Sequence, residues 1–265
     1  MARSLSTNRA SQNRKTSAKP ESLAERASFL AQQGRYDEAL QKVAEAMRLA
    51  PNNPWFSLQL ADIYKAQRRI EPAIEAMKHA VELDPTNCRA NELLLRTLLD
   101  LGRYDEAIAG SYRLLGCSPR SVLARDVLAI AYLESGRIDK ALEVVDQLIR
   151  IDPTNAAHYF KKGILLRQKG FFAEAMDFFC RVLDMDAEDE LAEEAVNAIT
   201  ELDSYQIKQI LTLAEEDPVF RAKFSLDREA AVEEKGFHLS PVGIRALRSI
   251  DISRLERNVW SPLYH

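Results

Sequence analysis

The side chains that most often bind metals or act as nucleophiles are few in this chain and lie far apart in sequence. The 265 residues include four histidines and three cysteines, which are His79, His158, His238, His265, Cys88, Cys117 and Cys180. A zinc site brings its ligands together at short spacings such as HExxH or CxxC. Neither spacing occurs in the sequence, so we expect no metal and no other cofactor.

Motifs for other catalytic chemistry are also missing. The sequence has no GxSxG nucleophile turn, no GxGxxG turn and no GxxxxGK[ST] phosphate loop. The acid pairs Glu193-Glu194 and Glu215-Glu216 are adjacent in sequence, so the two side chains of each pair diverge on a helix. Both pairs therefore predict solvated helix faces, and we expect a protein that is not an enzyme.

The cysteines and the apolar runs bear on the cellular compartment. The three cysteines fall in separate parts of the chain and fit no disulfide framework, which is typical of a reducing compartment. The sequence has no apolar run long enough to span a membrane and no apolar stretch at its N-terminus. We therefore expect a cytoplasmic protein with no membrane partner.

An internal repeat with a period of about 34 residues sets the helices of this chain. Five alanines lie at that interval, at Ala39, Ala73, Ala107, Ala141 and Ala175. A glycine stands five positions before each except at Arg68, and a proline stands twelve positions after each except at Ala187. Glycine favours the left-handed conformation that ends a helix, and proline cannot continue one. Because Asn53, Asn87 and Asn155 can then cap the next helix, the repeat predicts a series of helical hairpins.

This pattern resembles the tetratricopeptide-repeat family over residues 20–189. The five units are 20–53, 54–87, 88–121, 122–155 and 156–189. Leu95 replaces a small residue and Arg68 replaces a glycine of the pattern, and we interpret both as local adjustments of packing. The resemblance implies an all-α fold, a right-handed superhelix whose first helices line a groove that holds a partner. We therefore expect an interaction scaffold or adaptor.

The resemblance also places partner-contacting residues on the first helix of each repeat. The candidate groove residues are Trp55, Leu58, Arg89, Arg96, Leu99, Leu123, Asp126, Ile130, Leu133, Phe160, Ile164 and Arg167. Toward the C-terminal half they include an apolar strip that suits an amphipathic helix or an extended segment of a protein or peptide partner. The alternative is that the strip contacts adjoining helices or the chain's own C-terminal unit. Trp55 is either a partner contact or a cover for the first repeat.

The register of the repeats is expected to end at residue 189. Residues 190–203 have apolar side chains at helical spacing and predict a helix that caps the repeats. Four helix-capping signals follow, at Ser204, Asp217-Pro218, Asp227 and Ser240-Pro241. Residues 204–255 therefore predict a small unit of short helices.

That unit resembles the nitrile-hydratase-type leader peptides of bacterial modified-peptide precursors. The matching residues are Asp217-Pro218, Phe220-Arg221, Phe224, Asp227, Ala230-Ala231, Gly236-Phe237, Leu239, Ala246-Leu247 and Asp251. In that family the segment is a docking handle, so the resemblance implies a second contact through this module. An alternative function is a substrate or carrier that presents its C-terminal tail to a peptide-modifying enzyme. A plain helical cap is the third interpretation.

Charge is distributed unevenly although the net charge is only −4. Residues 1–19 carry five bases and no acid and predict a disordered basic tail, whereas residues 184–234 carry 16 acids and four bases. The tail is interpreted as a contact for nucleic acid or an acidic partner, as a transit peptide, or as a solvated balance to the acidic segment. Because the chain lacks a broad basic face, we do not expect nucleic acid to be its main partner.

The last residues of the chain, 256–265, form an aromatic C-terminal tail with Trp260, Leu263 and Tyr264. Three large apolar side chains at a free end would leave an adhesive patch. We therefore expect this tail to dock on the chain's own groove or on its C-terminal unit, and the alternative is burial on a partner.

Overall fold

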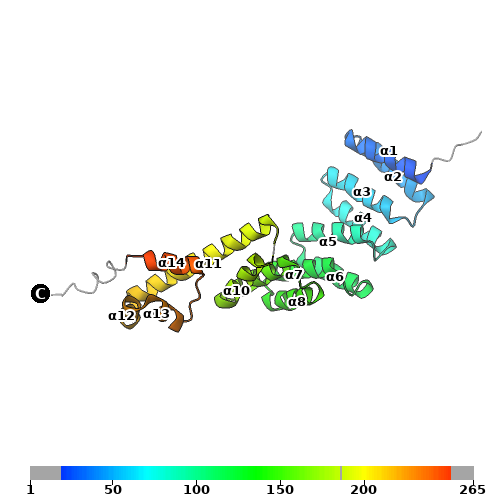
Figure 1. Ribbon diagram of the computed structural model, residues 1–265. Helices are drawn as coiled ribbons and strands as arrows, with labels where there is room; N and C mark the ends of the chain where they lie inside the picture. Colours follow the sequence, from blue (N-terminus) through cyan, green and yellow to red (C-terminus); the bar gives the residue numbers. More distant parts are fainter. Residues whose placement is uncertain (1–18, 186, 252–265) are drawn as a thin grey trace, which may run out of the picture. The chain divides into compact units, whose positions relative to one another are not determined.

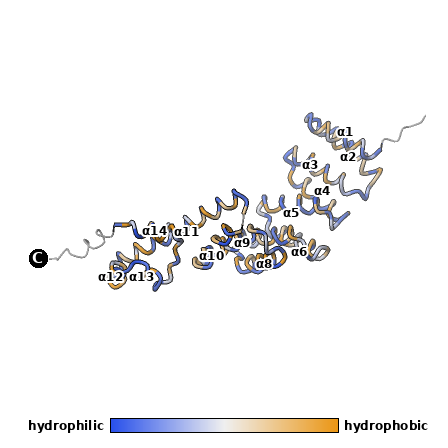
Figure 2. The backbone as a smooth tube through the Cα atoms, in the orientation of Figure 1, coloured by the Kyte–Doolittle hydropathy of each residue, from blue (hydrophilic) through white to orange (hydrophobic). Residues whose placement is uncertain are grey.

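The computed structural model describes residues 19–185 and 187–251, and these residues fold into 14 α-helices (Figure 1). Hydrophobic and hydrophilic stretches alternate along the helices, as expected when each helix buries one face (Figure 2). The basic tail and the aromatic tail predicted at the two ends lie outside the described residues, except Lys19.

The first ten helices occur as five consecutive pairs. Their bounds are α1 Pro20–Gln32, α2 Tyr36–Leu49, α3 Pro54–Ala66, α4 Ile70–Leu83, α5 Cys88–Asp100, α6 Tyr104–Cys117, α7 Val122–Glu134, α8 Ile138–Ile151, α9 Ala156–Gln168 and α10 Phe172–Leu183. Four further helices follow, α11 Asp189–Glu216, α12 Pro218–Leu226, α13 Arg228–Glu234 and α14 Pro241–Ser249. The predicted all-α solenoid of paired helices is thus confirmed.

The chain forms two compact units that divide between Thr97 and Leu98, within α5. The first unit is built from α1 to α4 and most of α5, and its largest core cluster gathers fully buried residues such as Val43 and Phe56. The second unit holds α6 to α14, with fully buried Phe179 in the core of its repeats.

The predicted caps explain where the helices begin. Asn53 and Asn155 each accept a hydrogen bond from the backbone two residues on, at 3.0 and 3.1 Å. Asn87 accepts one from the Ala90 amide at 3.0 Å. Each amide would otherwise lack a partner at the first turn of its helix. The three predictions are confirmed.

The turn inside each hairpin requires a residue with positive φ. Glycine supplies it in four repeats, with φ between 68° at Gly102 and 83° at Gly170. In the second repeat Arg68 adopts φ 58° at the equivalent position. A side chain with a Cβ is disfavoured in this left-handed conformation, so the second repeat keeps the turn at some cost in stability.

Gly163 on α9 shows why the repeat demands a small residue at this point of the first helix. A Cβ atom added to Gly163 would lie 2.5 Å from the ring of Phe179 on α10. That distance is well inside van der Waals contact. The large ring and the missing side chain together therefore set the close approach of α9 and α10.

The predicted helix boundary at Ser204 is wrong. Helix α11 runs without interruption for 28 residues, and Ser204 lies in its interior. The segment around it has no glycine or proline, and its neighbours Leu202, Asp203 and Gln206 are all buried by packing or hydrogen bonding. A serine can cap a helix, but tertiary contacts on both sides hold this one in a continuous helix.

The N-terminal half of α11 occupies the place of the first helix of a further repeat. Ala198, Ile199 and Leu202 pack against the core of the fifth repeat, which is the contact that the predicted capping helix requires. Arg167 on α9 donates to Glu201 at 3.0 Å, and these two residues are separated by one full repeat length. The register thus continues past residue 189 for one helix, contrary to the prediction.

The face of α11 that would meet a second helix is polar. Asn197 and Thr200 stand one repeat length after Gly163 and Leu166, which are buried, yet both are exposed. The last helix of a solenoid needs a polar outer face because no further repeat covers it. The polar side chains of Asn197 and Thr200 therefore leave no apolar surface on which a second helix of a further repeat could pack.

Helices α12, α13 and α14 gather around the C-terminal half of α11 (Figure 1) and form a core with Ile210, Phe220 and Phe224. We call this group of helices the C-terminal module. Its predicted caps are confirmed, because Asp217, Asp227 and Ser240 each accept hydrogen bonds from the first turn of α12, α13 and α14.

Two buried polar side chains of α11 hold the module in place. Asp203, 5% exposed, accepts from the amide of Ser240 at 2.9 Å and from its hydroxyl at 2.5 Å. Gln206 exchanges two hydrogen bonds with the backbone of His238, at 2.7 and 2.9 Å. Because these partners are distant from α11 in sequence, the bonds pin the segment before α14 to α11.

Candidate partner-binding surfaces

An apolar recess lies between α7 and α9 in the second unit. Its wall residues are Ile130 and Leu133 on α7 and Phe160 and Ile164 on α9, and it encloses about 150 Å³. We call it the apolar recess. The structure therefore brings together four of the predicted groove residues. Ile130 is 38% exposed, which is high for an isoleucine of a folded chain, and the other three are half-buried.

The one charged residue in the recess is already paired. Lys161 donates to Asp126 on α7 at 2.5 Å, and both side chains are about one-third exposed. The predicted groove residue Asp126 is therefore engaged within the chain. Because the pair neutralises itself at the edge, the recess offers an almost purely apolar surface.

A second hollow, of about 290 Å³, adjoins α9 on the side of α11. The predicted groove residue Arg167 lines it together with Phe172, Glu201 and Tyr205. The rings of Phe172 and Tyr205 meet edge to face at 5.3 Å. Sequence reasoning missed Glu201 and Tyr205, although the step of one repeat length from Arg167 to Glu201 was a signal that could have found the first.

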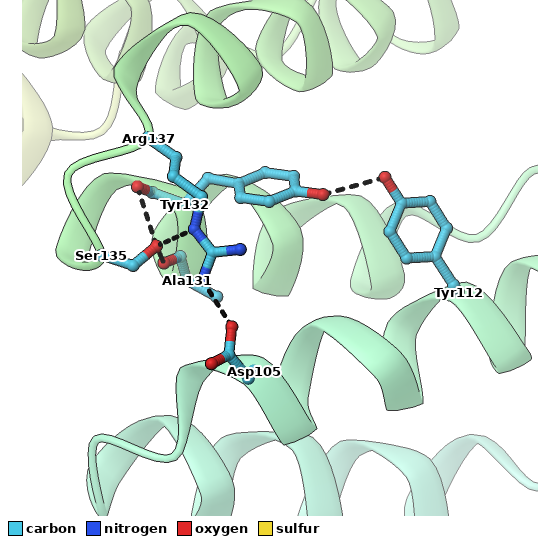
Figure 3. Close-up of polar contacts among 6 residues, drawn as sticks. All are labelled: Asp105, Tyr112, Ala131, Tyr132, Ser135 and Arg137. Atoms are coloured by element: carbon cyan, nitrogen blue, oxygen red, sulfur yellow. Dashed lines mark hydrogen bonds and ion pairs between the residues drawn. The ribbon is translucent and has the colours of Figure 1, made fainter.

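A polar cluster fixes α7, which carries half of the apolar recess, against α6 (Figure 3). Arg137 donates to Asp105 at 2.5 Å and to the Ser135 hydroxyl at 3.0 Å. The hydroxyl groups of Tyr112 and Tyr132 lie 3.0 Å apart. Burial and this hydrogen bond raise the pKa of Tyr132 to about 12, so the Tyr132 hydroxyl keeps its proton at physiological pH.

The first unit has a recess of different character, which we call the polar recess. It encloses about 320 Å³, and Trp55, Asp62 and Arg89 line it together with Ser28 and Gln59. Gln59 donates to the Ser28 hydroxyl at 3.0 Å. Trp55 also packs against the core of the first repeat, as expected of a cover for that repeat, and its predicted contact with a partner stays a prediction.

Leu58, a predicted groove residue of the second repeat, does not join a recess. It is only 3% exposed and packs against Ala80 and Ala90, so its predicted contact with a partner is wrong. Its position on α3 faces the two following helices, α4 and α5, which bury it.

Three further predicted groove residues lie outside both recesses. Arg96 is exposed and pairs with Glu92 one turn earlier at 3.0 Å. Leu99 and Leu123 are half-buried. None of these three residues lines the apolar or the polar recess.

Within the described ranges 19–185 and 187–251, no group of three His, Cys, Asp or Glu residues is placed to hold a metal ion. Cys88 and Cys117 are exposed free thiols, whereas burial raises the pKa of the half-buried Cys180. No described helix is long and apolar enough to cross a membrane.

Comparison with known proteins gives the family and the fold. The family model described as tetratricopeptide repeat matches residues 30–96 and 98–162. No curated protein matches the sequence. The leader-peptide resemblance of the C-terminal segment finds no support in these comparisons and stays a prediction.

Several solved structures share the fold. MamA, residues 41 to the end, from Desulfovibrio magneticus RS-1 is 19% identical with a TM-score of 0.52, over 64% of this chain and 96% of that one. A second MamA structure is 25% identical with a TM-score of 0.50, over 64% and 96%. YrrB, described as a TPR protein with an unusual peptide-binding site, is 18% identical with a TM-score of 0.51, over 66% and 91%. Through its residues 30–162, this chain belongs to the tetratricopeptide-repeat family.

Proposed function

We propose that this chain is a non-enzymatic scaffold that holds an apolar segment of a partner protein in the apolar recess. The observation that carries the proposal is the convergence of Ile130, Leu133, Phe160 and Ile164 on one open surface. Burying one such side chain contributes about 1.5–3 kcal/mol relative to exposure. A partner that covers several of them would gain enough to bind specifically.

To contact both helices of the recess, the partner segment needs at least two apolar side chains on the same face. The four recess residues come from two helices, α7 and α9, so a helix or an extended strand lying between these helices contacts both. Peptide binding is known for YrrB from its description, and we extend it to this chain as part of the proposal. Two further predicted groove residues, Trp55 and Arg89, line the polar recess and would add selectivity for the partner.

A second contact through the C-terminal module completes the proposal. The module is tied firmly to α11 by Asp203 and Gln206, so it offers a rigid surface. The alternative function, a carrier whose tail is modified by an enzyme, stays a prediction because the tail residues 252–265 lie outside the described residues. A cytoplasmic location also stays a prediction.

Site-specific photocrosslinking in the source cell tests the scaffold proposal. Benzoylphenylalanine replaces Ile130 in one variant and Ile151 in its control; both isoleucines belong to the second unit and are 38% and 37% exposed. We expect one protein to crosslink from position 130 and not from position 151, through an amphipathic segment identified by mass spectrometry. Equal crosslinking from the two positions, or none from position 130, contradicts the proposal.

A further inference from the structure

A third opening, of about 240 Å³, lies in the second unit, where α10 meets the C-terminal module. We call it the module cleft. Buried Met176, Val232 and Leu247 contribute to its lining from α10, α13 and α14. The cleft is separate from the apolar recess, because the two share no lining residue.

The walls of the module cleft are apolar and partly open. Phe237, Leu239 and Ile244 line it. Phe237 and Leu239 also pack against the core of the module, and all three side chains are only half-buried. A concave apolar surface of this size accepts one large apolar side chain of a partner.

The polar lining of the cleft consists of three carboxylates and the exposed side chain of His238. Asp177 projects from α10, and Glu229 and Glu233 lie one turn apart on α13, so three carboxylates face one opening. Glu229 is paired with Arg248. Asp177 and Glu233 are exposed and make no ion pair with any other described residue.

From this arrangement we infer that the module cleft binds a protein segment in which one large apolar side chain is flanked by lysine or arginine about one helical turn away. The apolar side chain enters between Phe237 and Ile244, and the cationic groups meet the carboxylates of Asp177 and Glu233. Charge complementarity selects this occupant over an acidic or neutral segment. The inference rests on the proposed second contact through the module. It adds which surface of the module makes the contact and what chemistry the partner segment must have.

Isothermal titration calorimetry of the full chain tests the inference with two synthetic helical peptides. One carries leucines on one face and lysines on the other, and its counterpart has every lysine replaced by glutamate. We expect micromolar binding of the leucine–lysine peptide and at least tenfold weaker binding of the leucine–glutamate peptide. Equal binding of the two peptides overturns the inference.

Charge-reversal variants locate the binding. We expect Asp177→Lys/Glu233→Lys to weaken the leucine–lysine peptide at least tenfold. The control Glu215→Lys/Glu216→Lys makes the same change of net charge at exposed residues outside the cleft and should change affinity less than twofold. The same loss in both double variants shows non-specific attraction and overturns the inference.

A matched pair on α14 tests the apolar part. Ile244→Ser removes a wall of the cleft, whereas Val242→Ser changes a residue that is 59% exposed on the same helix and does not line the cleft. We expect at least fivefold weaker binding for the first and no change for the second. Circular dichroism of both variants verifies that the module remains helical. Binding that survives Ile244→Ser in a folded variant overturns the inference.

Two further outcomes separate this inference from the scaffold proposal. Ile130→Glu in the apolar recess should leave binding of the leucine–lysine peptide unchanged. If it abolishes binding, the peptide sits in the apolar recess, so the cleft inference fails while the scaffold proposal stands. If deleting residues 1–18 strengthens binding of the peptide at least tenfold, the occupant is the chain's own basic tail, and the inference of an external partner fails.

Discussion

The polar recess of the first unit is lined by Ser28, Gln59, Asp62 and Arg89 around Trp55, whereas the apolar recess of the second unit is lined by Ile130, Leu133, Phe160 and Ile164. First helices of neighbouring repeats carry these residues in both recesses. The repeat therefore decides where a recess forms, and the residues at a few exposed positions decide what it can bind.

The difference assigns different tasks to the two surfaces. Covering an apolar side chain is favourable without any matching group. A polar group must exchange its hydrogen bonds with water for equivalent ones with the partner, and its net gain is only about 0.5–1.5 kcal/mol. We therefore expect affinity to come from the apolar recess, and selectivity against mismatched partners to come from the polar recess.

The largest expected effect is a loss of partner binding on Ile130→Glu. A carboxylate placed in the apolar recess must be desolvated when the partner binds, so we expect affinity for the crosslinked partner to fall at least a hundredfold, or about 2.7 kcal/mol. In the polar recess, Asp62→Ala should change affinity less than tenfold. Titration calorimetry with the partner segment measures both. If Asp62→Ala costs more than Ile130→Glu, the assignment of affinity to the apolar recess is wrong.

The next effect concerns the packing beneath the apolar recess. Gly163→Ala places a methyl group 2.5 Å from Phe179, and Phe179 in turn lies 5.6 Å from the recess residue Phe160 between ring centroids. Overpacking of this kind costs about 1–3 kcal/mol. Urea denaturation should show that loss in the free energy of unfolding.

A second substitution sharpens this result. The preceding repeat combines Ala129 with Val145, and these residues stand at the positions equivalent to Gly163 and Phe179. Gly163→Ala/Phe179→Val copies that combination. We expect the double variant to lose less stability than the sum of the two single variants by about 1 kcal/mol or more, because the two residues contact each other. Strict additivity would mean that the close approach does not limit packing.

A smaller effect compares the turns of the two units. Arg68 in the first unit and Gly136 in the second stand at equivalent positions with φ 58° and 72°. Arg68→Gly should stabilise the chain by about 1 kcal/mol, since the left-handed conformation costs a residue with a Cβ about that amount. Gly136→Ala should destabilise by a similar amount, because the space around Gly136 is open and only the backbone is strained. Thermal denaturation measures both, and a loss of stability in Arg68→Gly would show that the arginine side chain has a structural role.

The sequence predicted most of the repeat region because its signals are local. Asn53 and Asn155 cap their helices through hydrogen bonds to amides only two residues away. Gly34 and Gly170 form the hairpin turns through their own backbone conformation. Because the period is constant, the same caps and turns recur in each repeat. Four recess residues, Ile130, Leu133, Phe160 and Ile164, could be predicted because the register fixes which side of a first helix they occupy.

The failures have long-range causes. Leu58 is buried by Ala80 and Ala90, which come from the two following helices, and no local pattern shows that contact. Ser204 has the chemistry of a cap, yet the neighbouring Asp203 and Gln206 bond to Ser240 and His238, far along the chain, and keep α11 continuous. The module cleft likewise joins residues of α10 and α14, which sequence spacing alone does not bring together.

The smallest expected effect is a dependence of stability on pH that is specific to the second unit. His158 on α9 is 1% exposed, and neither ring nitrogen has a hydrogen-bond partner among the described residues. Burial lowers the pKa of His158 below 6.5; Lys161 acts in the same direction, whereas Asp126 and Asp152 oppose the shift. These opposing carboxylates keep the effect small.

The sign follows from the direction of this shift. Below pH 6.5 the unfolded chain binds a proton at His158 more readily than the folded chain, so the free energy of unfolding falls as the pH falls through this range. His158→Leu removes no hydrogen bond that the structure shows. We expect the free energy of unfolding of this variant to vary less with pH between 7.5 and 5 than that of the parent chain. Urea denaturation followed by circular dichroism across this range compares the variant with the parent chain. His79→Leu, in the first unit, is the control, and an equal flattening in that variant would show that burial of His158 does not cause the effect.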